Sequence, residues 1–261
     1  MKNHYLPRRF KKEEIVLAPI DWAGLLSNYS WFRRKALKET KPGYYSLIAI
    51  VLTGIVKQDK HLIDIAVELT KETVSKKDYL PVVGSALSTL GLEDEGIAML
   101  REAVKLDPAH STLLLLAAEV KDLEQKEELS KKVLSENPQD IDAIRHLAYA
   151  KYFKGELEEA GRLIDRILEA DADNVFALEF KGNISFDKKD YKDALKQYHR
   201  IQLKPMPILL QVRICYCFHS LGMNRKAKKM AKKLKSKVAS LHESRQEVKI
   251  INKYLSDIMN A

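Results

Sequence analysis

The sequence predicts an all-α protein, an α-solenoid of about five to six helical hairpins that ends in a C-terminal capping helix. The first observation behind this prediction is a pattern of turn and small residues that returns at near-constant spacing along the chain. The second is that apolar residues in each copy follow the i, i+3, i+4, i+7 spacing of one helix face. The third is composition, since 10 Gly and 8 Pro in 261 residues disfavour a many-turned β protein.

Residues 1–41 form a basic N-terminal segment that contains no copy of the pattern. Asp21 stands where it could cap a helix that runs from Trp22 through Phe32, and Pro19 comes just before that start. We therefore expect this segment to be partly helical.

Residues 42–241 carry the repeated hairpins. Small residues open the second helices of the later copies, at Ala160, Ala194 and Ala227. Gly84 and Gly182 lie inside first helices, where Gly costs about 1 kcal/mol relative to Ala, so we expect a crossing helix to pack closely there. The predicted units are about 43–76, 77–110, 111–140, 141–174, 175–207 and 208–241.

Two stretches depart from the regular unit. The unit 111–140 is short for the period, and its pattern predicts helices at 112–123 and 125–134. Residues 242–261 place Val248, Ile251, Leu255 and Ile258 on one helix face, which predicts the capping helix that covers the last hairpin.

The unit 175–207 carries Leu178, Gly182, Phe186, Ala194 and Tyr198 in the order of a known repeat. This pattern resembles the tetratricopeptide repeat, a unit of 34 residues that folds as a helical hairpin. The resemblance implies a right-handed α-solenoid whose first helices line a concave groove. In the family, such a groove holds a segment of a partner protein.

The resemblance also implies which side chains line that groove. Those we select are Arg145, Tyr149, Tyr152, Glu179, Asn183, Phe186, Tyr216 and His219. For Tyr152 and Phe186, packing in the core is the open alternative. Tyr149 and Glu179 stand where chaperone-binding members have other residues, which disfavours a clamp for a C-terminal carboxylate.

The net charge of +9 is divided unevenly along the chain. Residues 1–41 carry +6, residues 42–204 carry −6 and residues 205–261 carry +9. Much of the last excess is a basic patch of Arg225, Lys226, Lys228, Lys229, Lys232, Lys233, Lys235 and Lys237. A solvated helix surface is the plain interpretation; a nucleic-acid phosphate, an anionic membrane surface or an acidic protein are the functional ones. Self-association, with the basic end of one molecule on the acidic middle of another, is a further alternative.

The sequence offers no catalytic, cofactor-binding or metal-ligating set of residues. The seven His are scattered, and Cys215 and Cys217 point about 200° apart on one helix, so they cannot share a metal ion. No apolar run reaches the roughly 20 residues of a membrane-spanning helix, and we expect a cytoplasmic protein. Our leading hypothesis is a non-enzymatic adaptor that binds a protein segment in its groove. The alternative is a regulator that uses its basic ends to bind nucleic acid or an anionic surface.

Overall fold

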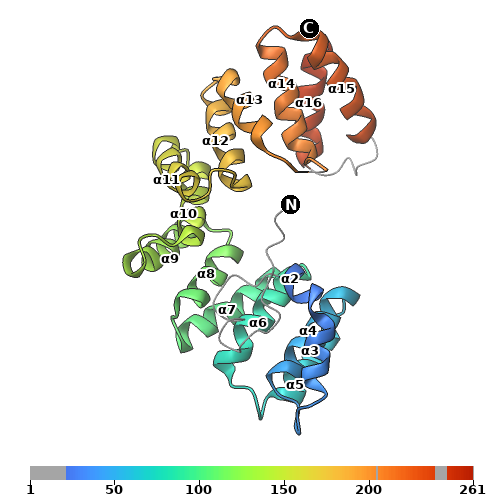
Figure 1. Ribbon diagram of the computed structural model, residues 1–261, viewed down its shortest axis with the longest axis vertical. Helices are drawn as coiled ribbons and strands as arrows, with labels where there is room; N and C mark the ends of the chain where they lie inside the picture. The colour runs from blue at the N-terminus through green and yellow to red at the C-terminus, as the bar shows by residue number, and fades with distance from the viewer. Residues whose placement is uncertain (1–21, 204, 239–245, 261) are drawn as a thin grey trace. The chain divides into compact units, whose positions relative to one another are not determined.

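A computed structural model describes residues 22–203, 205–238 and 246–260 of the chain (Figure 1). Over these residues the chain forms helices and no strand, which confirms the all-α prediction. The helices fall into two compact units, here called unit 1 and unit 2, with the boundary between Ala150 and Lys151. The boundary lies inside α10 (Ile141–Phe153) and therefore inside the predicted unit 141–174.

Unit 1 is a stack of helical pairs. Its helices are α2 (Trp22–Ser27), α3 (Tyr29–Ala36), α4 (Tyr44–Lys57), α5 (Lys60–Thr70), α6 (Lys76–Thr89), α7 (Glu93–Leu106), α8 (His110–Glu119), α9 (Leu123–Glu136) and the first part of α10. Helices α4 and α5, α6 and α7, and α8 and α9 pack as hairpins, and α6 also contacts α4 and α8. Each hairpin thus buries its apolar faces against the next one, as a solenoid requires.

Unit 2 continues the same construction. Its helices are the end of α10, α11 (Leu157–Ala170), α12 (Val175–Asp187), α13 (Tyr191–Arg200), α14 (Ile208–Ser220), α15 (Asn224–Val238) and α16 (Gln246–Asn260). Hairpins form from α12 with α13 and from α14 with α15. Helix α16 packs on both α14 and α15 and buries Val248, Ile251, Leu255 and Ile258 there, so the predicted C-terminal capping helix is confirmed.

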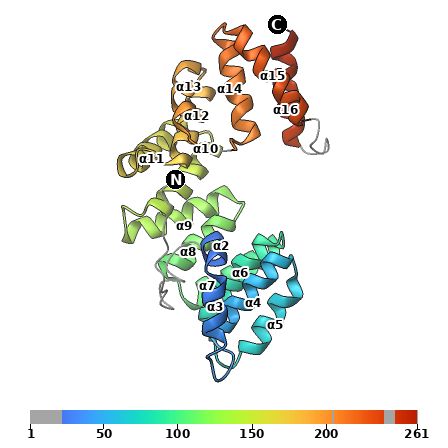
Figure 2. The same cartoon turned by 45° about the vertical axis from the view of Figure 1, so that its right-hand side comes forward.

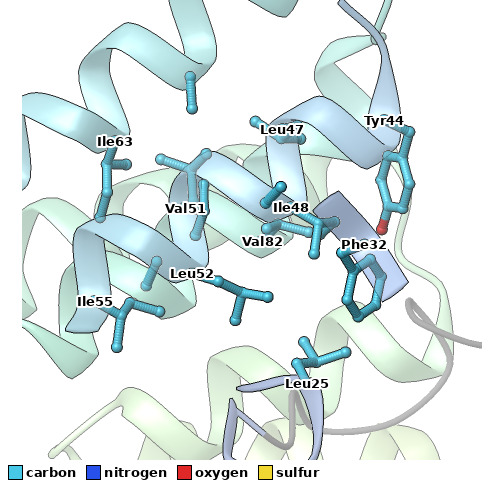
Figure 3. Close-up of a cluster of buried hydrophobic side chains, with 14 of the residues drawn as sticks. Leu25, Phe32, Tyr44, Leu47, Ile48, Val51, Leu52, Ile55, Ile63 and Val82 are labelled. Carbon is cyan, nitrogen blue, oxygen red and sulfur yellow. The ribbon is translucent and has the colours of Figure 1, made fainter. Parts of the chain in front are cut away.

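The largest apolar cluster of unit 1 surrounds α4 (Figure 3). Phe32 of α3 and Leu25 of α2 pack into it beside fully buried residues such as Leu47 and Leu52. In Figure 2, α2 and α3 lie beside α4. The single helix expected from Trp22 through Phe32 is therefore wrong: Asn28 leaves helical geometry, with φ −105° and ψ 12°, and separates two helices. Asp21, its expected cap, lies outside the described residues.

A left-handed residue turns the chain between the two helices of five hairpins. Gly91, Gly155 and Gly222 have φ of 80°, 82° and 73°, and Gln58 and Lys189 take the same place with φ of 54° and 64°. Gly adopts this conformation without strain, whereas a side chain there costs about 1–2 kcal/mol. These turns thus share one backbone geometry, which Gly, Lys and Gln adopt.

Close helix crossings explain the glycines inside first helices. A Cβ at Gly84 would lie 2.9 Å from the carbonyl oxygen of Gly96 and 2.9 Å from Leu100 Cγ. A Cβ at Gly182 would lie 2.3 Å from Cε1 of Tyr198, whose ring is fully buried. Neither position has room for a side chain, so both require Gly, as the sequence predicted.

The hairpin of α8 and α9 differs from its predicted bounds. Helix α8 ends at Glu119 rather than at residue 123, because Val120 turns to extended backbone with ψ 134°. The ammonium group of Lys126, in α9, donates to the carbonyl oxygens of Ala117 and Ala118 at that helix end. This buried side chain satisfies carbonyls that a helix C-terminus leaves without partners, and so stops α8 early.

Candidate functional site

One face of α12 collects the side chains that define the candidate site. Phe176, Glu179, Phe180, Asn183 and Asp187 recur at the i, i+3, i+4, i+7 spacing, so they lie along one side of the helix. Helix α14 places Leu209 and Arg213 on one side by the same rule. We call the following set the aromatic face of unit 2: Tyr152, Phe153, Phe176, Glu179, Phe180, Leu209 and Arg213.

Four rings of the aromatic face touch one another. Phe180 stacks on Phe176 with centroids 4.3 Å apart, and meets Tyr152 edge-on at 5.1 Å and Phe153 at 6.3 Å. Phe153 is 54% exposed and Leu209 is 38% exposed. Edge-to-face and stacked contacts stabilise such a group by about 0.5–1.5 kcal/mol per pair, so the rings form an ordered surface.

A half-buried charged pair borders these rings. The guanidinium of Arg213 lies 5.7 Å from the centre of the Phe186 ring and faces the hydroxyls of Tyr198 and Tyr152. Burial raises the pKa of Glu179, and the positive charge of Arg213 opposes that rise. Nη1 of Arg213 is buried and makes no hydrogen bond with a described residue. This edge of the face therefore combines a cation and a carboxyl group beside the aromatic rings.

Tyr152 and Glu179 lie on the aromatic face, among the residues that the sequence selected. The Tyr152 hydroxyl donates to Oδ2 of Asp187 at 2.5 Å. Burial, together with this hydrogen bond, raises the pKa of Tyr152 to about 12. Tyr152 thus fixes the end of α10 against α12, and its ring supports the exposed Phe153.

Asn183 and Phe186 were also selected for the groove, but the structure buries both. Asn183 is 5% exposed, and its Oδ1 accepts a hydrogen bond from the Tyr198 hydroxyl at 2.8 Å. Phe186 is 9% exposed and packs against Tyr191 and Tyr216. Neither side chain is open to a partner, because the neighbouring helices α13 and α14 cover them. Val212 of α14 is fully buried as well.

Tyr216 and His219 lie further along α14 and belong to a different group. Tyr216 is partly buried against Tyr254 of α16, with ring centroids 5.0 Å apart. His219 Nδ1 forms a 3.2 Å hydrogen bond with Oδ1 of Asn224, across the turn to α15. These two residues therefore join α14 to its neighbours rather than extend the aromatic face.

Arg145 and Tyr149 lie in unit 1, so they are described apart from the aromatic face. Arg145 Nη2 forms an ion pair with Asp142 Oδ1 at 2.8 Å on the same helix. The Tyr149 ring is 37% exposed and its centre lies 5.6 Å from the ammonium of the buried Lys126. Burial lowers the pKa of that Lys. Tyr149 thus contacts the cation that terminates α8.

Sequence reasoning missed three residues of this region: Phe180, Tyr198 as the partner of Asn183, and Arg213. Phe180 and Arg213 were visible as members of the i, i+4 series from Phe176 and Leu209. The groove positions carried over from the family did not include them. Which side chains of α12 and α14 stay open depends on helix crossing angles, which the spacing alone does not specify.

The basic patch lies on α15, and the structure exposes all eight of its cations. Below them Ala227, Ala231 and Leu234 are buried against α14 and α16. Over the described ranges there is no group of three or more His, Cys, Asp or Glu residues that could hold a metal ion. In the same part of the chain, every helix is too short or too polar to cross a membrane.

Comparisons with known proteins identify the repeat. The family model of the tetratricopeptide repeat matches residues 121–179. Among solved structures, a tetratricopeptide repeat protein from Parabacteroides merdae aligns over 95% of this chain and 96% of its own, at 14% identity and a TM-score of 0.61. PilW, a widely conserved type IV pilus biogenesis factor, aligns over 77% of this chain and 94% of its own, at 14% identity and a TM-score of 0.60.

A chain of the APC/C hetero-tetramer Cut9–Hcn1 has a TM-score of 0.64 at 13% identity, over 95% of this chain and 54% of its own. At these identities the similarity shows the fold alone. A search of the curated proteins gave no match.

Proposed function

Since the chain is a tetratricopeptide-repeat protein, we propose that it is a non-enzymatic adaptor that binds a segment of a partner protein on the aromatic face of unit 2. One observation carries this proposal: four aromatic rings touch one another at the surface, and Phe153 is more than half exposed. Exposed apolar patches of this kind are rare on proteins without partners, and aromatic anchors dominate binding energy at interfaces.

The chemistry of the face defines the partner segment. The rings and Leu209 favour apolar side chains, while Arg213 and Glu179 favour polar groups at one edge. A short amphipathic helix or an extended peptide with alternating apolar residues could present both. The proposed role is that of a scaffold, with no chemistry assigned to the chain itself. We place it in the cytoplasm, where the buried free thiols of Cys215 and Cys217 would stay reduced.

The test is a peptide-display selection against the full chain, followed by affinity measurements on purified variants. Phe153→Ser removes the most exposed ring of the face and should weaken selected peptides by about 30-fold or more, the effect of losing a hot spot of about 2 kcal/mol. Leu69→Ser removes an equally exposed apolar side chain of unit 1, which is 51% exposed, and should change nothing. Peptides that bind both variants as tightly as the wild type would refute the assignment. A selection that enriches no peptide would do the same.

A further inference from the structure

Helix α15 has one apolar side and one wide basic side. In Figure 1, α15 lies beside α14 and α16. Ala227, Ala231, Leu234 and Val238 are buried in the last apolar cluster of unit 2, which these helices share. The rest of the helix surface carries the eight exposed cations of the basic patch, with the exposed Asn224 and Ser236 and the partly buried Met230. Packing within unit 2 therefore uses the apolar side and leaves the basic side open.

The cations cover an arc rather than a line. At 100° per residue they spread over about 200° of the helix circumference, with Lys228 and Lys235 near one edge and Lys226 and Lys233 near the other. From Arg225 to Lys237 they extend about 18 Å along the axis. The result is a convex basic ridge whose charges point to both sides as well as outward.

The ridge lacks the internal neutralisation found elsewhere in unit 2. Lys181 Nζ lies 2.5 Å from Asp165 Oδ1, and Lys188 Nζ lies 3.0 Å from Glu158 Oε1. Helix α15 has no acid in its first turn. With Lys237 left aside, no cation of the ridge forms an ion pair with another described residue, although Lys226 lies 5.7 Å from the Phe218 ring centre. This concentration of charge repels itself and is stabilised by a polyanion.

We propose that α15 binds the phosphate backbone of double-stranded DNA without reading its sequence. The major groove of B-form DNA is about 12 Å wide and admits an α-helix between two walls of phosphates. A ridge with cations on both flanks can contact both walls at once. Seven of the eight cations are Lys, which acts as a point charge on phosphate and lacks the bidentate geometry with which Arg reads guanine.

Other polyanions fit this surface less well. A membrane is flat and would meet only part of the arc, and the apolar stripe that could enter lipid is already packed in unit 2. Single strands are held by stacking on aromatic rings, and the exposed arc has none. A second copy would have to offer acids, yet many carboxylates of the acidic middle, such as Glu158 and Asp165, pair with Lys of their own chain.

The experiment titrates the full chain with a labelled DNA duplex of about two helical turns, of mixed sequence, between about 50 and 200 mM salt. With six to eight phosphate contacts, log K should fall with log salt at a slope of about −5 to −7. Two double variants each remove the cations of one edge of the ridge: Lys228→Gln/Lys235→Gln and Lys226→Gln/Lys233→Gln. Each double variant should make the slope less steep by about 1.8, because each lost phosphate contact contributes about 0.9 to it. Lys105→Gln/Lys132→Gln, at exposed positions of unit 1, is the matched control and should leave it unchanged.

Three results would overturn the proposal. The first is no binding to the duplex at the lowest salt. The second is an effect of only one edge pair, which indicates contact with a flat surface. The third is binding to phosphatidylserine vesicles or to polyglutamate that matches the duplex at equal charge, since a partner of either class does not require a groove. Far-UV circular dichroism of each variant confirms that α15 remains helical.

Discussion

Gly182→Ala tests the packing of α12 against α13 most directly. The added Cβ would lie 2.3 Å from Cε1 and 2.6 Å from Cδ1 of Tyr198, where carbon atoms normally stay about 3.5–4.0 Å apart. The ring would have to move by more than about 1 Å. It has little room, since it is fully buried and its hydroxyl donates to Asn183.

The expected loss of stability has three parts. Overpacking a well-filled core costs about 1–3 kcal/mol. Breaking the buried bond between Tyr198 and Asn183 costs about 1–3 kcal/mol more. Ala regains about 1 kcal/mol over Gly inside a helix. The net prediction is that Gly182→Ala destabilises unit 2 by about 3 kcal/mol.

The assay compares urea unfolding by far-UV circular dichroism, with hydrogen exchange of the α12 and α13 amides to locate the effect. Gly161→Ala is the control, because Gly161 also lies inside a helix of unit 2 but a Cβ there meets nothing within 4 Å. That variant should be more stable than wild type by about 0.5–1 kcal/mol. If Gly182→Ala gains stability as Gly161→Ala does, the close crossing is refuted. In a Tyr198→Ala background, where the ring is absent, Gly182→Ala should no longer destabilise.

Two further predictions concern the turn before α13 and a buried imidazole. Lys189→Gly should stabilise unit 2 by about 0.5–1 kcal/mol, because Gly adopts the left-handed backbone of this position without strain. Lys192→Gly, inside α13, is the control and should destabilise unit 2 by about 1 kcal/mol. Urea midpoints of the two variants that shift in the same direction would contradict this prediction. Burial, with the charges of Arg145 and Lys126, lowers the pKa of His146 to about 3, below its unfolded value of about 6.5. Its contribution to stability is therefore complete above about pH 6.5 and is lost as the pH falls towards 3. Between pH 7 and pH 5 the wild type should lose about 2 kcal/mol more than His146→Gln, and equal losses would show that the ring is solvated.

The candidate site shows where sequence reasoning stops. The resemblance to the repeat family identified α12 and α14 as helices that line the groove, and Tyr152 and Glu179 lie on the aromatic face. The same resemblance counted Asn183 as exposed, because a repeat pattern does not show that Tyr198 of the next helix covers Asn183 and donates a hydrogen bond to it. One residue along a helix is a rotation of about 100°, so a small error in the facing direction exchanges a buried residue for an exposed one.

The sequence by itself determined the helical hairpins, their period, the small residues at their crossings and the apolar face of the last helix. These features are local, since each depends on residues within one or two helices of each other, and period and composition record them directly. The tertiary structure alone decided that α8 ends early on Lys126, that the helices divide into two units within α10, and which side chains of α12 and α14 remain exposed. Those outcomes depend on which neighbouring helix covers a given side chain. Such a contact joins residues of different helices, and a periodic sequence pattern does not specify it.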